Sequence, residues 1–189
     1  MADVRLPYRF KANCQKKAVQ FRSDMELQTY DPLNAFELSN YLGVRCLPHS
    51  EICNGDPRFD CLNCSHWSAV LLMDGTSPMI IYNATHAETR SQSSIMHEIS
   101  HFILKHTAPP LLSDFPLFHI DHEPQQELEA NTLSSILLLP RVVLEHCAKK
   151  AMKIDAIVDV YGISKSLARK ELNMSGVLKQ YSRWDPFTV

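Results

Sequence analysis

The sequence predicts an α+β fold, in which helices precede and follow one short antiparallel sheet. Two observations lead to this prediction. Helix-like segments occupy the first 43 residues and return from residue 93 onward, whereas the middle of the chain holds two apolar runs joined by a polar turn. No internal repeat is visible. With 189 residues, of which 45% are hydrophobic, the chain is long enough to bury a single core.

The first half is predicted to contain two helices and a strand. The first helix covers Phe10–Arg22. The second covers Asp31–Leu42, with its first residue as the cap and the following proline at the first helical position, and it ends at Gly43. A short strand follows at Val44–Leu47, and residues 48–65 are expected to be irregular.

The middle and the second half continue with a hairpin and further helices. Trp67–Met73 and Met79–Tyr82 flank the turn Asp74–Ser77, as expected for an antiparallel hairpin. The remaining predictions are a helix at Ser93–Lys105, a long loop from Pro109 to about Pro124, helices at Gln125–Leu138 and Val142–Met152, and a small helical pair at Ile154–Leu172.

The composition argues against nucleic acid and membranes as the main partners. A net charge of −2 and a pI near 6.5 are unlike those of proteins that neutralise phosphates. Met1–Lys17 lacks the apolar core of a secretory signal, and the apolar runs around Val70 and Leu137 are too short to cross a bilayer. The six cysteines fit reduced thiols. We therefore expect a cytoplasmic protein.

The most informative motif is His-Glu-Ile-Ser-His at positions 97–101, inside a predicted helix. On an α-helix His97 and His101 lie about 40° apart around the axis, so both imidazoles reach one metal ion. This is the HExxH pattern of zinc hydrolases. Apolar flanks and a glutamate-bearing helix further along the chain favour a real site over a chance match. We predict one catalytic Zn²⁺ ion bound by these histidines.

A catalytic zinc ion takes three protein ligands and leaves one position for water. No metzincin-type extension follows His101, and we expect His106 to be turned away by helical phase. The next long helix offers Glu127 and Glu129, which lie about 200° apart around its axis and do not both face the ion. We choose Glu127, because Asn131 lies one turn further on the same face and there accepts the N–H of a ligand imidazole. Glu129 is the alternative ligand, and otherwise faces solvent or an ion pair.

Glu98 is predicted to be the catalytic residue. Zinc lowers the pKa of bound water to about 7, and a neighbouring carboxylate takes the proton and later passes it to the leaving amine. A further donor for the oxyanion is expected. The candidates are Tyr82, Arg90 and His106.

Two blocks of sequence resemble the ImmA/IrrE family of metallopeptidases. The first comprises Ile80–Asn83, Arg90–Gln92 and Met96–His101, and the second runs from Gln126–Asn131 into Leu137–Arg141. Weaker matches lie outside them, at Arg9–Lys11, Asp31–Leu33, Tyr41–Val44, Trp67–Ala69 and Tyr161–Leu172.

The resemblance implies a gluzincin-like zinc site with a glutamate as third ligand. We expect a zincin-like peptidase domain over residues 1–150 and a helix-turn-helix-like C-terminal element over 151–189, packed on it. The family's role implies a zinc endopeptidase that cleaves a partner repressor carrying a helix-turn-helix domain. Cleavage would relieve repression of a mobile-element, defence or DNA-damage-response (stress-response) operon. The alternative is a non-proteolytic zinc-binding regulator that sequesters its repressor.

Two further features leave alternatives open. Cys46, Cys53, Cys61 and Cys64 form a Cx6Cx7CxxC array, which we interpret mainly as reduced thiols. A structural metal, or a thiolate that occupies the open zinc position and keeps the enzyme latent, are the alternatives. In the C-terminal element, Lys165, Arg169 and Lys170 are basic. Direct DNA contact therefore stays open beside the packing role that we favour.

Overall fold

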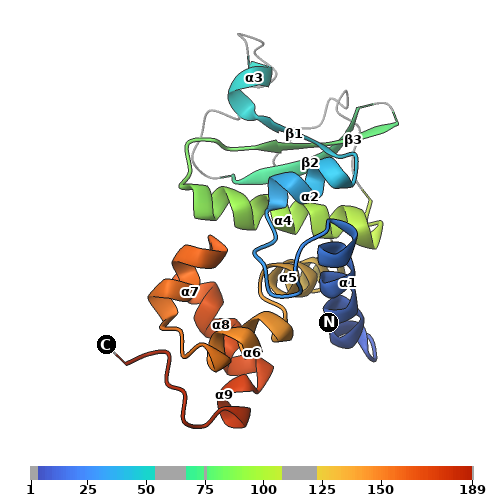
Figure 1. Ribbon diagram of the computed structural model, residues 1–189. Coiled ribbons are helices and arrows are strands. Elements are labelled where there is room, and N and C mark those ends of the chain that lie inside the picture. Colours follow the sequence, from blue (N-terminus) through green and yellow to red (C-terminus); the bar gives the residue numbers. More distant parts are fainter. Residues whose placement is uncertain (1–3, 54–66, 75, 108–122, 189) are drawn as a thin grey trace.

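The computed structural model describes residues 4–53, 67–74, 76–107 and 123–188. Its sheet has the strand order β1 (Arg45–Pro48), β3 (Ser77–Tyr82), β2 (Ala69–Asp74) and forms one outer layer (Figure 1). The β2–β3 hairpin is antiparallel, as predicted. β1 pairs with β3 in parallel, so the sheet is mixed. β2 runs antiparallel to both of the other strands, so the chain returns along β2 and enters β3 in the direction of β1.

The helices of the N-terminal half are α1 (Phe10–Asp24), α2 (Ala35–Tyr41) and α3 (His49–Cys53). The predicted start of the second helix was wrong. Asn34 caps α2, because its side-chain oxygen accepts the backbone N–H groups of Phe36 and Glu37 in the first turn of the helix. The Asp31 carboxylate instead accepts the N–H of Gln28, which precedes it in the chain. α3 lies in a segment that we expected to be irregular.

Two long helices form the centre of the molecule. α4 (Glu88–Leu104) lies against the sheet and contains the HExxH motif, and α5 (Pro124–Leu138) lies on the other side of α4, beside α1 (Figure 1). α4 starts five residues earlier than predicted. Since α4 is covered by the sheet on one side and by α5 on the other, many of its side chains are buried, including those of Glu98 and His101.

The C-terminal region consists of α6 (Arg141–Lys149), α7 (Ile154–Tyr161), α8 (Lys165–Ser175) and α9 (Val177–Gln180). α7 and α8 are the predicted helical pair. Gly162, with φ +59°, ends α7, and Ser164 caps α8 by accepting the Leu167 N–H. α8 contacts α5, α9 contacts α6 and α7 packs on α8, and side chains of all four helices belong to the common core (Figure 1).

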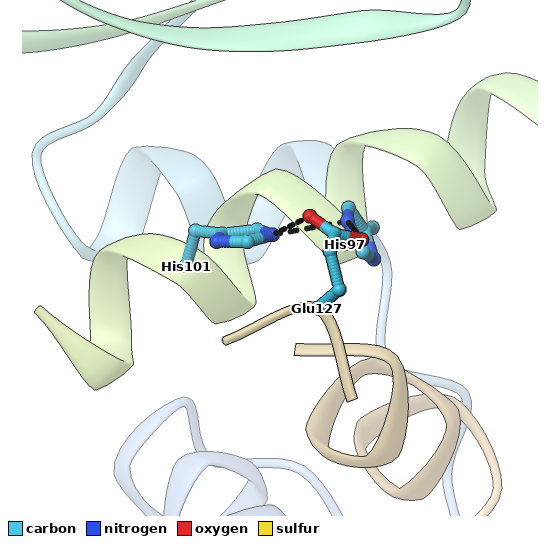
Figure 2. Close-up of side chains that lie close together, drawn as sticks. All are labelled: His97, His101 and Glu127. Carbon is cyan, nitrogen blue, oxygen red and sulfur yellow. Dashed lines mark hydrogen bonds and ion pairs between the residues drawn. The ribbon is translucent and has the colours of Figure 1, made fainter. Parts of the chain in front are cut away.

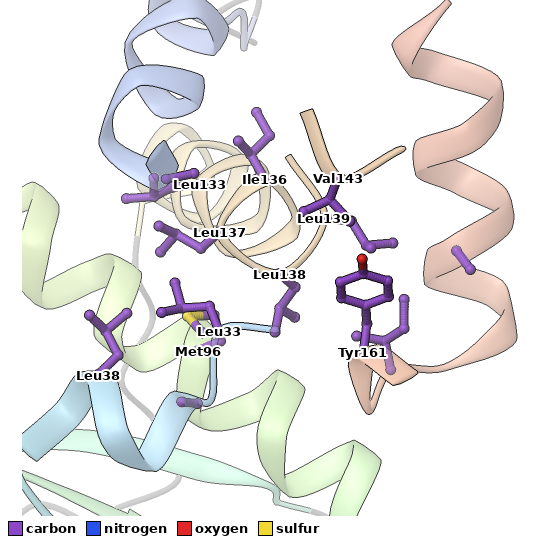
Figure 3. Packing of buried hydrophobic residues seen from close by; sticks show 14 of the residues in the cluster. Leu33, Leu38, Met96, Leu133, Ile136, Leu137, Leu138, Leu139, Val143 and Tyr161 are labelled. Atoms are coloured by element: carbon purple, nitrogen blue, oxygen red, sulfur yellow. The ribbon is translucent and has the colours of Figure 1, made fainter. Parts of the chain in front are cut away.

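One continuous core joins these parts. Figure 3 shows residues of α5 and the segment after it between Leu33, Leu38 and Met96 on one side and Val143 and Tyr161 on the other. α1 adds an unusual member, Arg22, which is fully buried. In the part of the chain that the structure describes, no helix is both long and apolar enough to span a membrane.

Candidate metal centre and cleft

The HExxH motif brings its two histidines together on one face of α4. His97 and His101 lie one turn apart, and their Nε2 atoms are 3.0 Å from each other (Figure 2). His101 is completely buried, whereas His97 keeps a side-chain exposure of 22%. One imidazole is therefore fixed in the interior and the other borders solvent.

The third member of the cluster comes from the first turns of α5. Glu127 places Oε1 3.2 Å from His101 Nε2 and Oε2 3.4 Å from His97 Nε2 (Figure 2). One ligand atom from each residue lies within 4.8 Å of the others. Among the described residues no other group of three or more histidines, cysteines and carboxylates is arranged in this way.

These distances fit a tetrahedral metal ion. With zinc–ligand bonds of about 2.0–2.1 Å and tetrahedral angles, two ligand atoms are roughly 3.3 Å apart. The Nε2–Nε2 separation of 3.0 Å, and the 3.2 Å and 3.4 Å between each imidazole and one of the two Glu127 oxygens, fall around that value. Two imidazoles and a carboxylate are also a donor set that zinc accepts. The side chains therefore need little rearrangement to hold such an ion.

Glu98 points from α4 toward the sheet and lies beside this cluster. Its side chain is buried, and its Oε2 accepts a hydrogen bond of 2.9 Å from the backbone N–H of Leu71 in β2. Burial raises the pKa of Glu98 to about 8, the Leu71 N–H opposes this rise, and the negative charge of Glu127 adds to it. The carboxyl is therefore poised to exchange a proton near neutral pH.

A cavity of about 450 Å³ opens beside His97 and Glu98. Its walls come from β2 with the residue before it, from α4, from α5 and from α8. Half of the lining residues are serines, and Lys170 of α8 contributes a cation whose Nζ donates to Ser135 Oγ at 3.1 Å. The C-terminal helices thus form part of the cleft, which sequence reasoning missed.

The structure shows where three further residues around the cluster lie, and Glu129 makes the ion pair that was expected if it is not a ligand. The Nδ1 of His101 lies 2.9 Å from Nδ1 of His106, and Nε2 of His106 lies 3.5 Å from Glu129 Oε2. The expectation that His106 is turned away was wrong, because α4 ends before it and the chain folds back. Asn131, expected beside a ligand imidazole, is exposed and lines the cleft.

The remaining candidates lie in different places. Tyr82 packs its ring against Phe36 with the ring centroids 5.4 Å apart, and the Nη2 of Arg90 donates to Ser68 Oγ at 2.9 Å. Cys46 is a free thiol whose pKa burial raises to about 12. The rest of the cysteine array cannot be placed with it, since Cys61 and Cys64 lie outside the described residues and nothing is described of the Cys53 side chain.

A family model for peptidases, described as the IrrE N-terminal-like domain, matches residues 58–173. That range covers more than half of the chain. The chain belongs to this family. The match confirms the ImmA/IrrE resemblance and the predicted fold class, and it identifies the chain as a metallopeptidase of the ImmA/IrrE type. It extends from before β2 to within α8, so it includes the HExxH helix, α5 and most of the cleft. None of the curated proteins compared matches this ImmA/IrrE-type chain.

Proposed function

We propose that the protein is a zinc endopeptidase that cleaves a helix-turn-helix repressor. His97, His101 and Glu127 bind the ion and Glu98 is the general acid and base. The observation that carries the proposal is the meeting of three ligand atoms, from two helices, beside a buried carboxyl at the head of a cavity. Family membership supports peptide-bond hydrolysis as the reaction.

When bound, zinc supplies polarisation of the scissile carbonyl and a lowered pKa for water. Its positive charge would also bring the pKa of Glu98 down from about 8, so that the carboxylate accepts a proton from the attacking water. Glu98 then delivers this proton to the leaving amine. The Leu71 N–H holds one carboxylate oxygen in place throughout, which leaves the other oxygen for proton transfer.

The edge of the sheet suggests how a peptide lies in the cleft. β2 is at the edge of the described sheet, and Ser68 and Ala69 line the cavity. The Ser68 carbonyl accepts the Asn83 N–H, so in an antiparallel ladder the main-chain groups of Ala69 face away from β3. An extended substrate can add to this edge as a further strand. Its side chains would then meet the serines and Lys170.

Coexpression with a helix-turn-helix repressor chosen from the products of neighbouring genes, followed by mass spectrometry of fragments, tests the proposal. We expect one defined cleavage with the zinc-loaded wild type and at least about a 100-fold slower reaction with Glu98→Gln, which retains zinc. If the wild type and Glu98→Gln both relieve repression and no fragment of the repressor is found, proteolysis is contradicted and the sequestering alternative is supported.

A further inference from the structure

Behind His101, on the side away from Glu127, lies a second row of polar side chains. His101 Nδ1 contacts His106 Nδ1 at 2.9 Å, and His106 Nε2 lies 3.5 Å from Glu129 Oε2. The other oxygen of Glu129 accepts from Gln125 Nε2 at 2.6 Å. The His106 side chain is only 6% exposed and that of Glu129 17%. The row is therefore largely shielded from water, and its members depend on one another for hydrogen bonding.

The end of α4 creates this row. Lys105 adopts the left-handed conformation with φ +59°, its N–H bonds to the Phe102 carbonyl, and the His106 N–H bonds to the His101 carbonyl. This is the Schellman arrangement, which reverses the chain at a helix end. The reversal brings the ring of His106 back over His101, so a residue outside the helix lies beside the imidazole inside it.

The contacts permit one arrangement of protons when His101 is a metal ligand. Its Nε2 must then present a lone pair to the ion, so its Nδ1 carries the hydrogen. That hydrogen is donated to His106 Nδ1, which leaves the proton of a neutral His106 on Nε2. This proton faces the carboxylate of Glu129. Glu129, which His106 and His101 separate from the ion, thus selects the tautomer of the ligand His101.

We propose that Glu129 and His106 are positioning residues for the metal centre. They act in series, Glu129 orienting His106 and His106 holding His101 with Nε2 toward His97 and Glu127. The inference rests on the proposed zinc site. It also gives the two glutamates of α5 different tasks, with Glu127 binding the ion and Glu129 acting through two histidines. Such partners are worth about 10–100-fold in metal affinity.

Zinc affinity, measured on purified protein by competition with a chelating dye at constant pH, tests the inference. We expect the Kd for zinc to rise about 10–100-fold in Glu129→Met and in His106→Phe. Because the two residues act in series, the Kd for zinc of the double variant should not exceed that of the single variant with the higher Kd. The matched control is Glu123→Met, an exposed carboxylate at the start of the same helix, which should change the Kd less than twofold.

Long-range ¹H–¹⁵N spectra of zinc-loaded wild-type protein provide a readout that does not require the variants to fold. We expect a proton on Nδ1 of His101, and a proton on Nε2 would overturn the inference. An unchanged Kd in Glu129→Met, or penalties that multiply in the double variant, would overturn it as well. If zinc binds the wild type and is lost in Glu127→Ala while Glu129→Met is normal, only this inference fails. If the wild type binds no zinc, the proposed function fails with it.

Discussion

The two ends of α5 place charged groups in different surroundings. At its C-terminal end the guanidinium of Arg22 is fully buried and donates to three backbone carbonyls, those of Ala18, Asp31 and Leu137, at 2.8–3.1 Å. At its N-terminal end Glu127 and Glu129 face histidine rings. Arg22 meets backbone atoms that cannot change their protonation, whereas the glutamates meet groups that gain or lose protons or a metal ion.

The difference separates a structural charge from a functional one. Burial lowers the pKa of Arg22 to about 10, yet the group stays charged, and its position at the C-terminal end of α5 complements the helix dipole. The N-terminal end keeps Glu127 39% exposed and next to a cleft. A carboxylate that is left open in this way contributes little to folding and is available to bind an ion.

The largest expected effect comes from substitution of Glu127, at the N-terminal end of α5. Glu127→Ala removes one of three ligands, so we expect zinc binding to be lost and cleavage of the repressor to fall by about 10³-fold or more, since metal polarisation is worth several kcal/mol. The stability of the metal-free protein should change by less than about 0.5 kcal/mol. Metal analysis and urea unfolding measure both quantities. A variant that keeps stoichiometric zinc would show that another residue completes the site.

Substitution of Arg22, at the C-terminal end of α5, should lower stability and leave zinc affinity almost unchanged. Arg22→Met removes the side-chain donor of three backbone carbonyls, two of them buried, and we expect a loss of about 3 kcal/mol or more in the free energy of unfolding. Zinc affinity of the folded variant should remain within twofold. Lys16→Met, which removes an exposed cation from α1, the helix that carries Arg22, is the control and should cost less than about 0.5 kcal/mol. Equal stability of the two variants would contradict the structural role of Arg22.

The pH dependence of stability probes the Glu98 carboxyl, whose pKa the negative charge of Glu127 helps to raise. The metal-free folded protein keeps a proton on Glu98 up to about pH 8, whereas the unfolded chain releases it near pH 4.5. Stability is therefore highest at low pH within this window and falls as the pH rises from about 5 to 8. We expect a drop of about 2 kcal/mol, less than the full shift implies because Glu98 borders a cavity.

The same urea titrations on metal-free Glu98→Gln give the control. An amide does not titrate, so the difference between the two stability curves isolates Glu98 from every other group. A difference that stays constant between pH 5 and pH 8 would show that the carboxyl is ionised in the folded protein. Addition of zinc should reduce the pH dependence, because a cation favours the charged form.

Local patterns predicted much of the fold and part of the site. Alternation and turn residues identified the hairpin, and the HExxH spacing placed His97 and His101 on one helical face. The phase of α5 separated Glu127 from Glu129, and the structure brings Glu127 to the two Nε2 atoms. Each of these inferences needed only residues within a few turns of one another.

What was missed depends on contacts between distant segments. The parallel pairing of β1 with β3 joins segments that are distant in the sequence, and the α8 wall of the cleft is set by tertiary packing. Helical phase misplaced His106 because it was applied to a residue beyond the predicted end of the helix at Lys105. That end was predicted to within one residue, but the chain reversal that returns the His106 ring to His101 was not.

The smallest effect tests how the end of α4 supports the N-terminal half of α5. Lys105 has φ +59°, where a side chain costs about 1 kcal/mol and glycine costs nothing. Since glycine also gains freedom in the unfolded chain, we expect Lys105→Gly to stabilise the metal-free protein by only about 0.5 kcal/mol. Lys150→Gly, with φ −88° at the end of α6, should be slightly destabilising instead.

Lys105→Val should destabilise the protein and weaken zinc binding, because valine resists the backbone conformation that holds His106 over His101. If Lys105→Val leaves the zinc Kd unchanged, the metal centre does not depend on the chain reversal, and the N-terminal end of α5 holds its ion without support from behind His101.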